Sequence, residues 1–591
     1  MAVTSEPTPT EDANPPRLHE PATLVEALEH AARGDKGYNY YDARGRLQEV
    51  LTYRRLARMA AATGRRLRGL GLAPGARVVI ALDTEAAFPV LFFGCRYAGF
   101  VPVALPMPVH LGSHRAYVDQ LRGLIAGCDA ALVVAGSGVE EFVAEALSGS
   151  RTVPMYTPAE LADLPQDPGP LPAGGPDDIA YMQFTSGSTR FSRAAEITER
   201  AVLSNLRGTI QHGLRITPAD RCASWLPYYH DMGLVGFLLT PVLALMSVDF
   251  MKPRDFAVRP LQWLRIISAN RCTIAFGPPF GYDLCAHRLR DAQAGELDLS
   301  SWRVAGVGAE MIRPAVLARF AGKLAPARFD PRAFVAAYGL AEASLAVSFA
   351  ALGKGITSVP ADAETLTSDA RVEPPRGDGA RALELVDCGR VLPDHELVIR
   401  DEAGRPLPER HIGRVTVRGP SLMRGYFRDP DSTRETLDPQ GWLDTGDLGC
   451  LVDGRLVVTG RSKDLIIVHG RNILPQDLEH LMETDVGLRT GDVSAFAVPD
   501  AQGSDHVVLV VQCRLQEPPE RAALVRRIQH VVYEHSGVHC EVDLVRPQTL
   551  PRTSSGKLSR SAARRDYLER VRRGESAARA PQAEAGVAGR S

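Results

Sequence analysis

The sequence lacks paired cysteines, an excess of charge of either sign, and an apolar leader. Its nine cysteines are scattered over 591 residues without a Cys-x-x-Cys pair, which argues against a disulfide framework or a zinc ribbon. With 68 Lys and Arg against 70 Asp and Glu, the net charge is −2, so no overall basic field exists to recruit nucleic acid or an anionic membrane. Residues 1–16 have neither a basic start nor an apolar core, and we therefore expect a cytoplasmic protein.

One apolar run is long enough to raise the question of a membrane span. Residues 233–251, GLVGFLLTPVLALMSVDFM, carry Pro241 at the centre and Asp249 near the end. They also lack a basic anchor on one flank. We predict a buried helix that ends at a strand, and no stable insertion into a membrane.

Two common phosphate-binding signatures are incomplete. The Gly556-Lys557 pair lacks the first glycine of a Walker loop, because Pro551 stands there, and Leu558 replaces the usual hydroxyl residue. The Gly306-x-Gly308 pair is followed by Met311 where a dinucleotide fingerprint has its third glycine. Any phosphate site in this chain must therefore use another loop.

From about Arg77 onward, short β-branched runs alternate with helical segments. Each run is apolar and ends at glycine, proline or a polar loop, as strands buried on both faces do. The strand candidates include RVVIAL (77–82), AALVVAG (130–136), IAYMQF (179–184), CASWLP (222–227), CTIAFG (272–277), RVAGVG (303–308) and AFVAAYG (333–339). The alternation predicts an α/β fold of layered, mostly parallel sheets.

The pattern changes after about residue 350. Residues 353–381 are polar and rich in proline and glycine, so we expect an inserted loop or a poorly ordered segment there. Short strands and a hairpin at Asp453-Gly454 then indicate a β-rich subdomain, and a new βα series follows Gly460. We predict a large N-terminal domain over residues 17–460, a small α+β C-terminal domain over 461–570, and disordered tails at 1–16 and 571–591.

Residues 181–190, YMQFTSGSTR, follow a predicted strand and are dense in hydroxyl groups around Gly187. Such a loop can offer backbone N–H groups and hydroxyls to phosphate oxygens, although a flexible turn without function has the same composition. Six further motifs follow in order: WLPYYHDMGL (225–234), GAE (308–310), YGLAEASL (338–345), GWLDTGDLG (441–449), GRSKDLIIVHGRNILPQDLE (460–479) and LPRTSSGKLSR (550–560).

This ordered set resembles the core motifs of the adenylate-forming superfamily, which contains acyl- and aryl-CoA synthetases, adenylation domains of peptide synthetases, and luciferases. The resemblance extends over about residues 20–565. Within the superfamily the chain looks most like the fatty-acyl-AMP ligases, because it has STR at 188–190, GRNILPQDLE at 470–479 and a polar insert at 353–381. In that family the insert is thought to restrain the C-terminal domain.

The resemblance implies an ATP site built from many of these residues. They are Thr185, Ser186, Gly187, Ser188, Thr189, Gly308, Ala309, Glu310, Tyr338, Gly339, Asp447 and Arg461. The loop at 185–189 would hold the β- and γ-phosphates, Tyr338 would stack on adenine, and Asp447 would accept hydrogen bonds from the ribose hydroxyls, with Arg461 as a further donor. A core tyrosine and ordinary surface charges are the structural alternatives.

The same resemblance assigns roles to four further residues. Lys557 matches the catalytic lysine, and Lys463 matches the hinge, where a few residues absorb a domain rotation. Glu342 matches a Mg²⁺-associated glutamate, and a carboxylate oxygen suits that ion. His230 would lie near the acyl carboxylate, although a structural histidine explains it equally well. The usual Pro-Lys-Gly after the phosphate loop is here Ser192-Arg193-Ala194, which leaves the role of Arg193 open.

Together these residues predict a ligase that uses ATP and Mg²⁺ to convert a fatty acid to acyl-AMP with release of pyrophosphate. It would then transfer the acyl group to the phosphopantetheine thiol of an acyl carrier protein, or of a carrier domain in a polyketide or nonribosomal peptide synthase. An acyl-CoA synthetase is the first alternative, and a nucleotide-binding protein without turnover is the second. Candidates for the acyl pocket, for which core packing is an equal explanation, are Met232, Leu234, Phe237 and Phe280.

Overall fold

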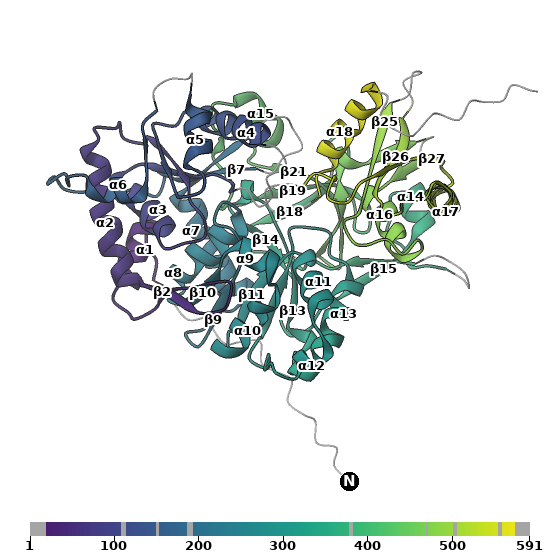
Figure 1. Cartoon of the computed structure of the whole chain (residues 1–591), viewed down its shortest axis with the longest axis horizontal. Coiled ribbons are helices and arrows are strands. Elements are labelled where there is room, and N and C mark those ends of the chain that lie inside the picture. Colours follow the sequence, from purple (N-terminus) through teal and green to yellow (C-terminus); the bar gives the residue numbers. More distant parts are fainter. Residues whose placement is uncertain are drawn as a thin grey trace, which may run out of the picture.

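The computed structural model describes residues 19–107, 114–148, 153–185, 193–376, 382–468, 471–499, 505–552 and 558–573. These residues form a large N-terminal domain and a small C-terminal domain, the latter at the upper right of Figure 1. The predicted α/β fold with two domains is therefore confirmed. The boundary predicted after Gly460 stays a prediction, and it falls within strand β22 (Arg455–Arg461).

One sheet of the large domain has seven strands, and its central strands are parallel as predicted. Its strands in spatial order are β20 (Gly425–Tyr426), β8 (Ala194–Thr198), β7 (Ile179–Phe184), β4 (Val101–Ala104), β3 (Arg77–Ala81), β5 (Leu132–Ala135) and β6 (Met155–Tyr156). Because β8 runs antiparallel to β7, the predicted phosphate loop connects two strands of a hairpin.

The second sheet has nine strands, of which six neighbouring ones are parallel. In spatial order it contains β17 (Arg390–Val391), β14 (Ala346–Phe349), β13 (Phe334–Gly339), β12 (Val304–Val307), β11 (Ile274–Gly277), β9 (Arg221–Ser224), β10 (Ser247–Met251), β1 (Gly37–Tyr41) and β2 (Leu47–Thr52). The carboxyl ends of the parallel strands carry several of the predicted site residues, including Gly308 after β12 and Tyr338 on β13.

One large hydrophobic core joins the two sheets. It contains Ile80 of β3 and Phe250 of β10 together with Phe92 and Phe93 of α3, all buried. The helices of this domain are α1 (Leu24–Ala31), α2 (Tyr53–Gly69), α3 (Ala87–Ala98), α4 (His114–Gly127), α5 (Glu140–Leu147), α6 (Pro158–Asp163), α7 (Glu199–Gly208), α8 (Thr240–Leu243), α9 (Pro253–Val258), α10 (Leu261–Asn270), α11 (Pro279–Arg288), α12 (Asp291–Ala294), α13 (Pro314–Leu324) and α15 (Pro430–Thr436).

The apolar run at 233–251 is a buried helical segment that ends at strand β10, as predicted. Its first part, η2 (Met232–Leu239), is a π-helix, and a second π-helix, η1 (Thr209–Gly213), follows α7. Thr240, the first residue of α8, donates its hydroxyl to the carbonyl of Val235 in η2 at 2.7 Å. π-Helical turns inside helices occur frequently at functional sites. No helix among the described residues is both long enough and apolar enough to span a membrane.

The β-rich subdomain is an antiparallel sheet of β18 (Glu396–Arg400), β19 (Gly413–Arg418), β21 (Leu443–Val452) and β22. The hairpin between β21 and β22 turns at Asp453 and Gly454, as predicted. Both residues have positive φ, 53° and 68°, which is the geometry that favours an Asp-Gly turn between twisted strands.

The expectation of a loop or a poorly ordered segment at 353–381 is wrong for residues 358–368. The segment forms β15 (Ser358–Asp362) and α14 (Ala363–Ser368), and β15 pairs with β16 (Ala382–Val386). Sparse apolar residues were enough to anchor it, because Ala361, Leu366 and Val372 pack into one cluster with Cys450 and Val457 of the β-rich sheet.

The small domain is built on the three-stranded sheet of β25 (Val493–Pro499), β26 (Asp505–Gln512) and β27 (Cys540–Val545). Helices α16 (Pro475–Thr484) and α17 (Pro518–Ser536) cover one face, with Leu509 in their cluster, and α18 (Arg560–Arg573) covers the other, with Val508. Neighbouring residues of a strand point to opposite faces, so the unbroken apolar run of β26 is explained by helices on both sides.

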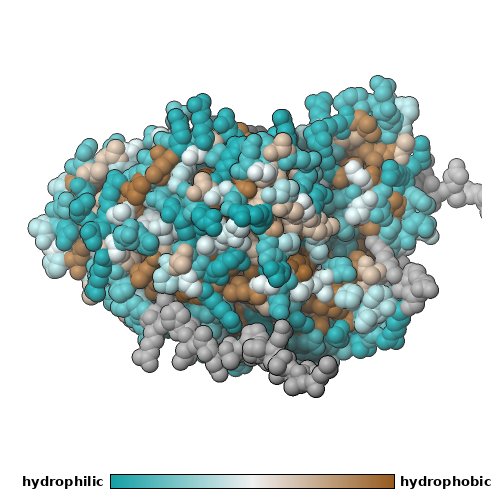
Figure 2. All heavy atoms as spheres, turned by 90° about the horizontal axis from the view of Figure 1, so that it is seen from below, coloured by the Kyte–Doolittle hydropathy of each residue, from teal (hydrophilic) through white to brown (hydrophobic). Residues whose placement is uncertain are grey.

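Among the described residues, several contacts connect the small domain to the large one besides the chain itself, including the hydrogen bond from Gln476 of α16 to the carbonyl of Thr459. Helix α14 of the insert packs against β24 (Arg471–Ile473), which pairs with β23 (Ile466–Val468), and Figure 1 draws α14 beside α16 and α17. Arg313, at the start of α13, forms an ion pair with Glu483 of α16. The face shown in Figure 2 is mostly hydrophilic, with hydrophobic residues in small separate groups.

Candidate functional site

One cavity of about 240 Å³ brings together eight of the predicted site residues. It lies at the carboxyl ends of the parallel strands and continues between the nine-stranded sheet and the two π-helices. The predicted residues in its lining are Thr185, His230, Gly308, Ala309, Tyr338, Gly339, Glu342 and Arg461. Glu310, Asp447 and Lys463 are not part of this lining.

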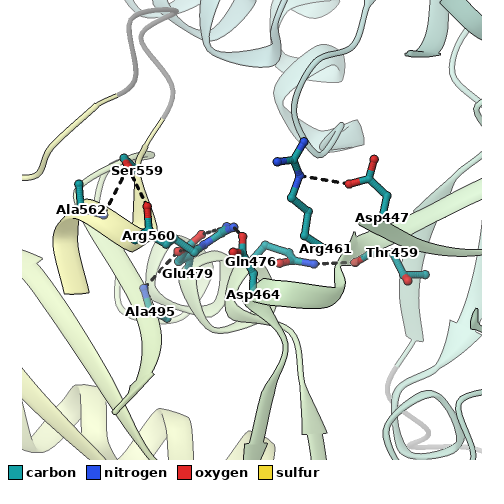
Figure 3. Close-up of polar contacts among 11 residues, drawn as sticks. Asp447, Thr459, Arg461, Asp464, Gln476, Glu479, Ala495, Ser559, Arg560 and Ala562 are labelled. Carbon is teal, nitrogen blue, oxygen red and sulfur yellow. Dashed lines mark hydrogen bonds and ion pairs between the residues drawn. The ribbon is translucent and has the colours of Figure 1, made fainter. Parts of the chain in front are cut away.

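Asp447 stands directly behind the lining and is held by two of its members. The Tyr338 hydroxyl donates to Asp447 Oδ2 at 2.7 Å, and Arg461 Nε donates to Asp447 Oδ1 at 3.1 Å. Figure 3 shows this second contact. Burial raises the pKa of Asp447, and the Arg461 guanidinium opposes that shift. The three side chains thus present a carboxylate and a guanidinium in fixed positions at the polar end of the cavity.

Glu342 lies in the short 3-10 turn η5 (Ala341–Ala343) and is oriented by Tyr426, whose hydroxyl donates to Glu342 Oε1 at 2.8 Å. Burial raises the pKa of Glu342, and the hydrogen bond from Tyr426 lowers it. The guanidinium of Arg193 lies over the Tyr426 ring, 5.3 Å from its centre, and 3.9 Å from Asp429. Tyr426 therefore connects Glu342 to the residue that closes the predicted phosphate loop.

The site supplies at most part of a metal coordination sphere. Among the described residues there is no group of three or more His, Cys, Asp or Glu side chains that could hold a metal ion. Glu342 offers one carboxylate in the cavity lining. This fits Mg²⁺, which is usually held by one or two carboxylates together with substrate phosphates and water.

The glycines of the site are explained by close packing of the backbone. A Cβ atom at Gly308 would lie 2.5 Å from the carbonyl oxygen of Ala337, and one at Gly339 would lie 1.9 Å from that of Leu345. Ala309 has a φ of 67°, a left-handed conformation that costs energy for a residue with a Cβ and is often found at functional sites. The backbone at 308–309 is thus held in one particular shape at the cavity wall.

His230 precedes η2 and points its ring at the neighbouring carboxylate. Its Nδ1 lies 2.6 Å from Asp231 Oδ1, and the same oxygen accepts from the amide of Met232 at 2.7 Å. Asp231 therefore caps the π-helix and fixes the imidazole at the same time. His230 itself lines the cavity, and its place beside the acyl carboxylate stays a prediction.

The phosphate loop and the proposed catalytic lysine fall largely outside the described residues. Thr185 is described, and its amide donates to the carbonyl of Arg193 at 2.9 Å, which closes the neck of the β7–β8 hairpin. Ser186, Gly187, Ser188 and Thr189, and also Lys557, lie outside. Their roles stay predictions.

A second polar cluster lies in the small domain, beside Lys463 of the turn η6 (Ser462–Asp464). Arg560 donates from Nε and Nη2 to the two carboxylate oxygens of Glu479 at 2.8 and 2.7 Å, and from Nη1 to Asp464 Oδ2 at 2.9 Å. Figure 3 shows this fork, together with Gln476 donating to the carbonyl of Thr459 at 2.6 Å. Arg560, three residues after Lys557, is thus attached to Asp464, which directly follows Lys463, and to Glu479.

The sequence predictions missed Arg560, Glu479 and Tyr426. Arg560 is the last residue of the motif at 550–560, and Glu479 is the last residue of the motif at 460–479. Of the four acyl-pocket candidates, Met232 and Phe237 line the cavity, whereas Leu234 and Phe280 are not in its lining. Leu234 is instead buried in the main core, 1% exposed. For Met232, Leu234 and Phe237, sequence periodicity could not distinguish cavity-lining from core residues, because a π-helix changes which residues share a face.

Comparisons with known proteins agree on one family. The profile of the AMP-binding enzyme family matches residues 28–427. A protein of Caulobacter vibrioides, provisionally named an acyl-CoA synthetase, is 44% identical over 95% of this chain and 98% of its own. The medium-chain-fatty-acid–[acyl-carrier-protein] ligase JamA of Moorena producens is 30% identical over 93% of this chain and 95% of its own.

A solved structure from a study of fatty acyl-adenylate ligases of E. coli and L. pneumophila matches with a TM-score of 0.90. It is 42% identical and covers 94% of this chain and 100% of that one.

Proposed function

The chain belongs to the AMP-binding enzyme family, and from this premise we propose that it is a fatty-acyl-AMP ligase that loads an acyl carrier protein. The observation that carries the proposal is the continuity of one cavity. It has a polar end at Tyr338, Glu342 and Arg461 and continues into a part lined by Phe237 and Phe276. A nucleotide and an apolar acid can therefore meet inside a single site.

In the first step the fatty carboxylate attacks the α-phosphate of ATP in line and pyrophosphate leaves. Positioning and electrostatic stabilisation supply most of the acceleration in such phosphoryl chemistry. Asp447 accepts from the ribose hydroxyls, Arg461 adds a donor, Tyr338 stacks on adenine, and the 185–189 loop holds the outer phosphates. Mg²⁺ bound at Glu342 would neutralise phosphate charge. His230, fixed by Asp231 at 2.6 Å, borders the acyl carboxylate.

In the second step the small domain rotates about Lys463 and withdraws Lys557 from the acyl-AMP. The phosphopantetheine thiol of a carrier protein then attacks the acyl carbonyl, and AMP leaves. The Arg560 fork to Glu479 and Asp464 supports this assignment, because it ties the segment after Lys557 to the hinge. We place the enzyme in the cytoplasm, where carrier proteins and ATP are available.

The test is a pyrophosphate-release assay with ATP, Mg²⁺ and a panel of fatty acids, followed by product analysis with a phosphopantetheinylated carrier protein or with CoA. We expect acyl-AMP with acid alone, acyl-carrier protein when the carrier is added, and little acyl-CoA. Absence of pyrophosphate release with every acid would reject the enzyme in favour of a nucleotide-binding protein without turnover.

The 44% identity to the Caulobacter protein keeps an acyl-CoA synthetase as the second candidate. Formation of acyl-CoA at a rate comparable to adenylation would establish that candidate instead. CoA carries a 3′-phosphoadenosine end that a carrier-borne pantetheine lacks, so the two acceptors differ by several negative charges.

A further inference from the structure

The cavity has a deep arm that runs along one face of the nine-stranded sheet. Phe276 of β11 pairs with Gly306 of β12, and a Cβ at Gly306 would lie 2.0 Å from the Phe276 ring. Glycine at 306 therefore makes room for the Phe276 ring. Gly308 lies two residues further along the strand and so belongs to the same face of the sheet. Ile274 and Cys222, which are register partners on β11 and β9, line the arm beyond it.

The strand register gives the depth of this arm. Ile274 pairs with Val304, which precedes Gly308 by four residues, so Ile274 lies about 13 Å below the level of Gly308 at about 3.3 Å per residue. An extended hydrocarbon advances about 1.25 Å per carbon, given a bond of about 1.5 Å and a near-tetrahedral angle. The distance from Gly308 to the level of Ile274 therefore corresponds to about ten carbons.

Met246 closes the arm one side-chain row below Cys222 and Ile274. Cys222 pairs with Val248 of β10, and Met246 precedes Val248 by two residues, so both belong to the same face if the strand is extended to Met246. Met246 lines the cavity and is 1% exposed. Its backbone is held from both sides, because its amide donates to Pro241 at 2.9 Å and its carbonyl accepts from the Tyr53 hydroxyl at 2.7 Å.

The walls of the deep arm are mostly apolar and suit a hydrocarbon, with the buried hydroxyl of Thr209 as a polar exception. The residues facing the sheet come from η1, from the segment that follows it, and from η2, and they include Leu214, Ile216 and Phe237. None of the described residues lining this arm is charged. A second arm leads toward α4 and has Gln120 and Gln183 in its lining, so it is the more polar of the two.

We propose that Met246, Ile274 and Cys222 form the floor of the acyl site and restrict the enzyme to medium-chain acids of about eight to twelve carbons. This inference rests on the proposed function. It decides a point that the relatives leave open, because both a medium-chain ligase and a long-chain ligase, the FadD32 protein of Mycolicibacterium smegmatis, are 30% identical to this chain.

The first test is the chain-length profile of the unmodified protein for acids from six to eighteen carbons, measured as acyl-AMP formation. We expect kcat/KM to rise by about fourfold per methylene, the value of one buried CH₂, up to about ten carbons. For hexadecanoic acid we expect at least a tenfold drop from the optimum. No turnover with any acid would refute the proposed function, whereas equal turnover of decanoic and hexadecanoic acid would refute the floor.

Two variants test whether these residues set the limit. Met246→Ala removes the closing side chain and should move the optimum to acids two or three carbons longer. Ile274→Phe should move it to shorter acids, and it should not do so if the chain enters the arm toward α4. The matched control is Met251→Ala, a methionine at the far end of β10 that is also 1% exposed but is not in the cavity lining.

The control separates a floor from a general loss of packing. We expect Met251→Ala to lower stability as Met246→Ala does, while its chain-length profile stays that of the unmodified protein. Identical profiles for the two methionine variants would overturn the proposal. If Ile274→Phe does not fold, the profiles of the unmodified protein and the two methionine variants still decide the matter.

Discussion

The two domains hold their polar groups in different ways. In the large domain, Asp447 accepts hydrogen bonds from Tyr338 and Arg461 at the polar end of a cavity beside the shared core. In the small domain, Arg560, Glu479 and Asp464 form a cluster over a three-stranded sheet, away from any described lining of that cavity. The first arrangement lies beside the cavity proposed to bind the nucleotide, and the second fixes one segment of the domain to another.

This difference suggests that the domains can be damaged separately. Among the described residues, the contacts between them include the Arg313–Glu483 ion pair, the packing of α14 on β24 and the hydrogen bond from Gln476 to the carbonyl of Thr459. Inter-domain interfaces of limited size allow relative motion. A substitution within either cluster should therefore affect its own domain first.

The largest expected effect is that of Arg560→Ala on the small domain. Glu479 is 5% exposed, and removing its partner leaves a buried carboxylate uncompensated, which typically costs about 3–5 kcal/mol. We expect faster hydrogen exchange in α16 and α18 and unchanged ATP affinity of the large domain. Arg572→Ala, at an exposed position of the same helix, is the control. Equal protection in the two variants would show that the fork does not hold the domain.

The next largest effect is expected for Lys557→Ala. Loss of one preorganised donor to developing charge costs about 10²–10³ in rate, so acyl-AMP formation should fall by that factor without loss of ATP binding. Single-turnover measurement of acyl-AMP checks this, with Lys354→Ala at an exposed position as the control. A decrease of less than tenfold would remove the catalytic role from Lys557.

Asp447→Ala should act on the large domain alone and weaken ATP binding at least tenfold, because hydrogen bonds to a charged group contribute about 1.5–3 kcal/mol. Titration calorimetry measures the affinity, and thermal unfolding followed in parallel reports whether Tyr338 and Arg461, deprived of their partner, destabilise the domain. Unchanged affinity in a folded variant would exclude Asp447 from the nucleotide site.

The smallest effect is expected for Tyr426→Phe, which tests the positioning of Glu342. The Tyr426 hydroxyl lowers the pKa of Glu342 against the raising effect of burial, so its removal raises that pKa further. If ionised Glu342 is needed for Mg²⁺·ATP, the acid limb of the adenylation pH profile moves to higher pH. At neutral pH we expect a decrease of about two- to tenfold.

Tyr533→Phe in α17, at a position 46% exposed, is the control for this variant. An acid limb that stays in place after Tyr426→Phe would contradict the assigned role of Tyr426. Magnesium titrations of adenylation in both variants give an independent reading of the same interaction.

Much of the fold followed from local patterns. Strand IAYMQF was predicted at 179–184 and lies at Ile179–Phe184, and the Asp453-Gly454 turn forms the expected hairpin. Continuous apolar runs and Asp-Gly turns are signals contained within a few residues. The prediction for the insert was wrong because Ala361, Leu366 and Val372 are not spaced periodically. They are anchored by contacts with strands that are distant in the sequence.

The sequence by itself determined the family and the order of the motifs, and it predicted many of the polar residues that line the cavity, because each motif is a short stretch of adjacent residues. Only the tertiary structure decided that Tyr426 donates a hydrogen bond to Glu342 and that Arg560 donates to Glu479 and Asp464. It alone also showed which apolar residues line the cavity. The polar contacts join residues up to about a hundred positions apart in the sequence. The lining of the cavity depends on a π-helix and on strand register, which the periodicity of the sequence does not reveal.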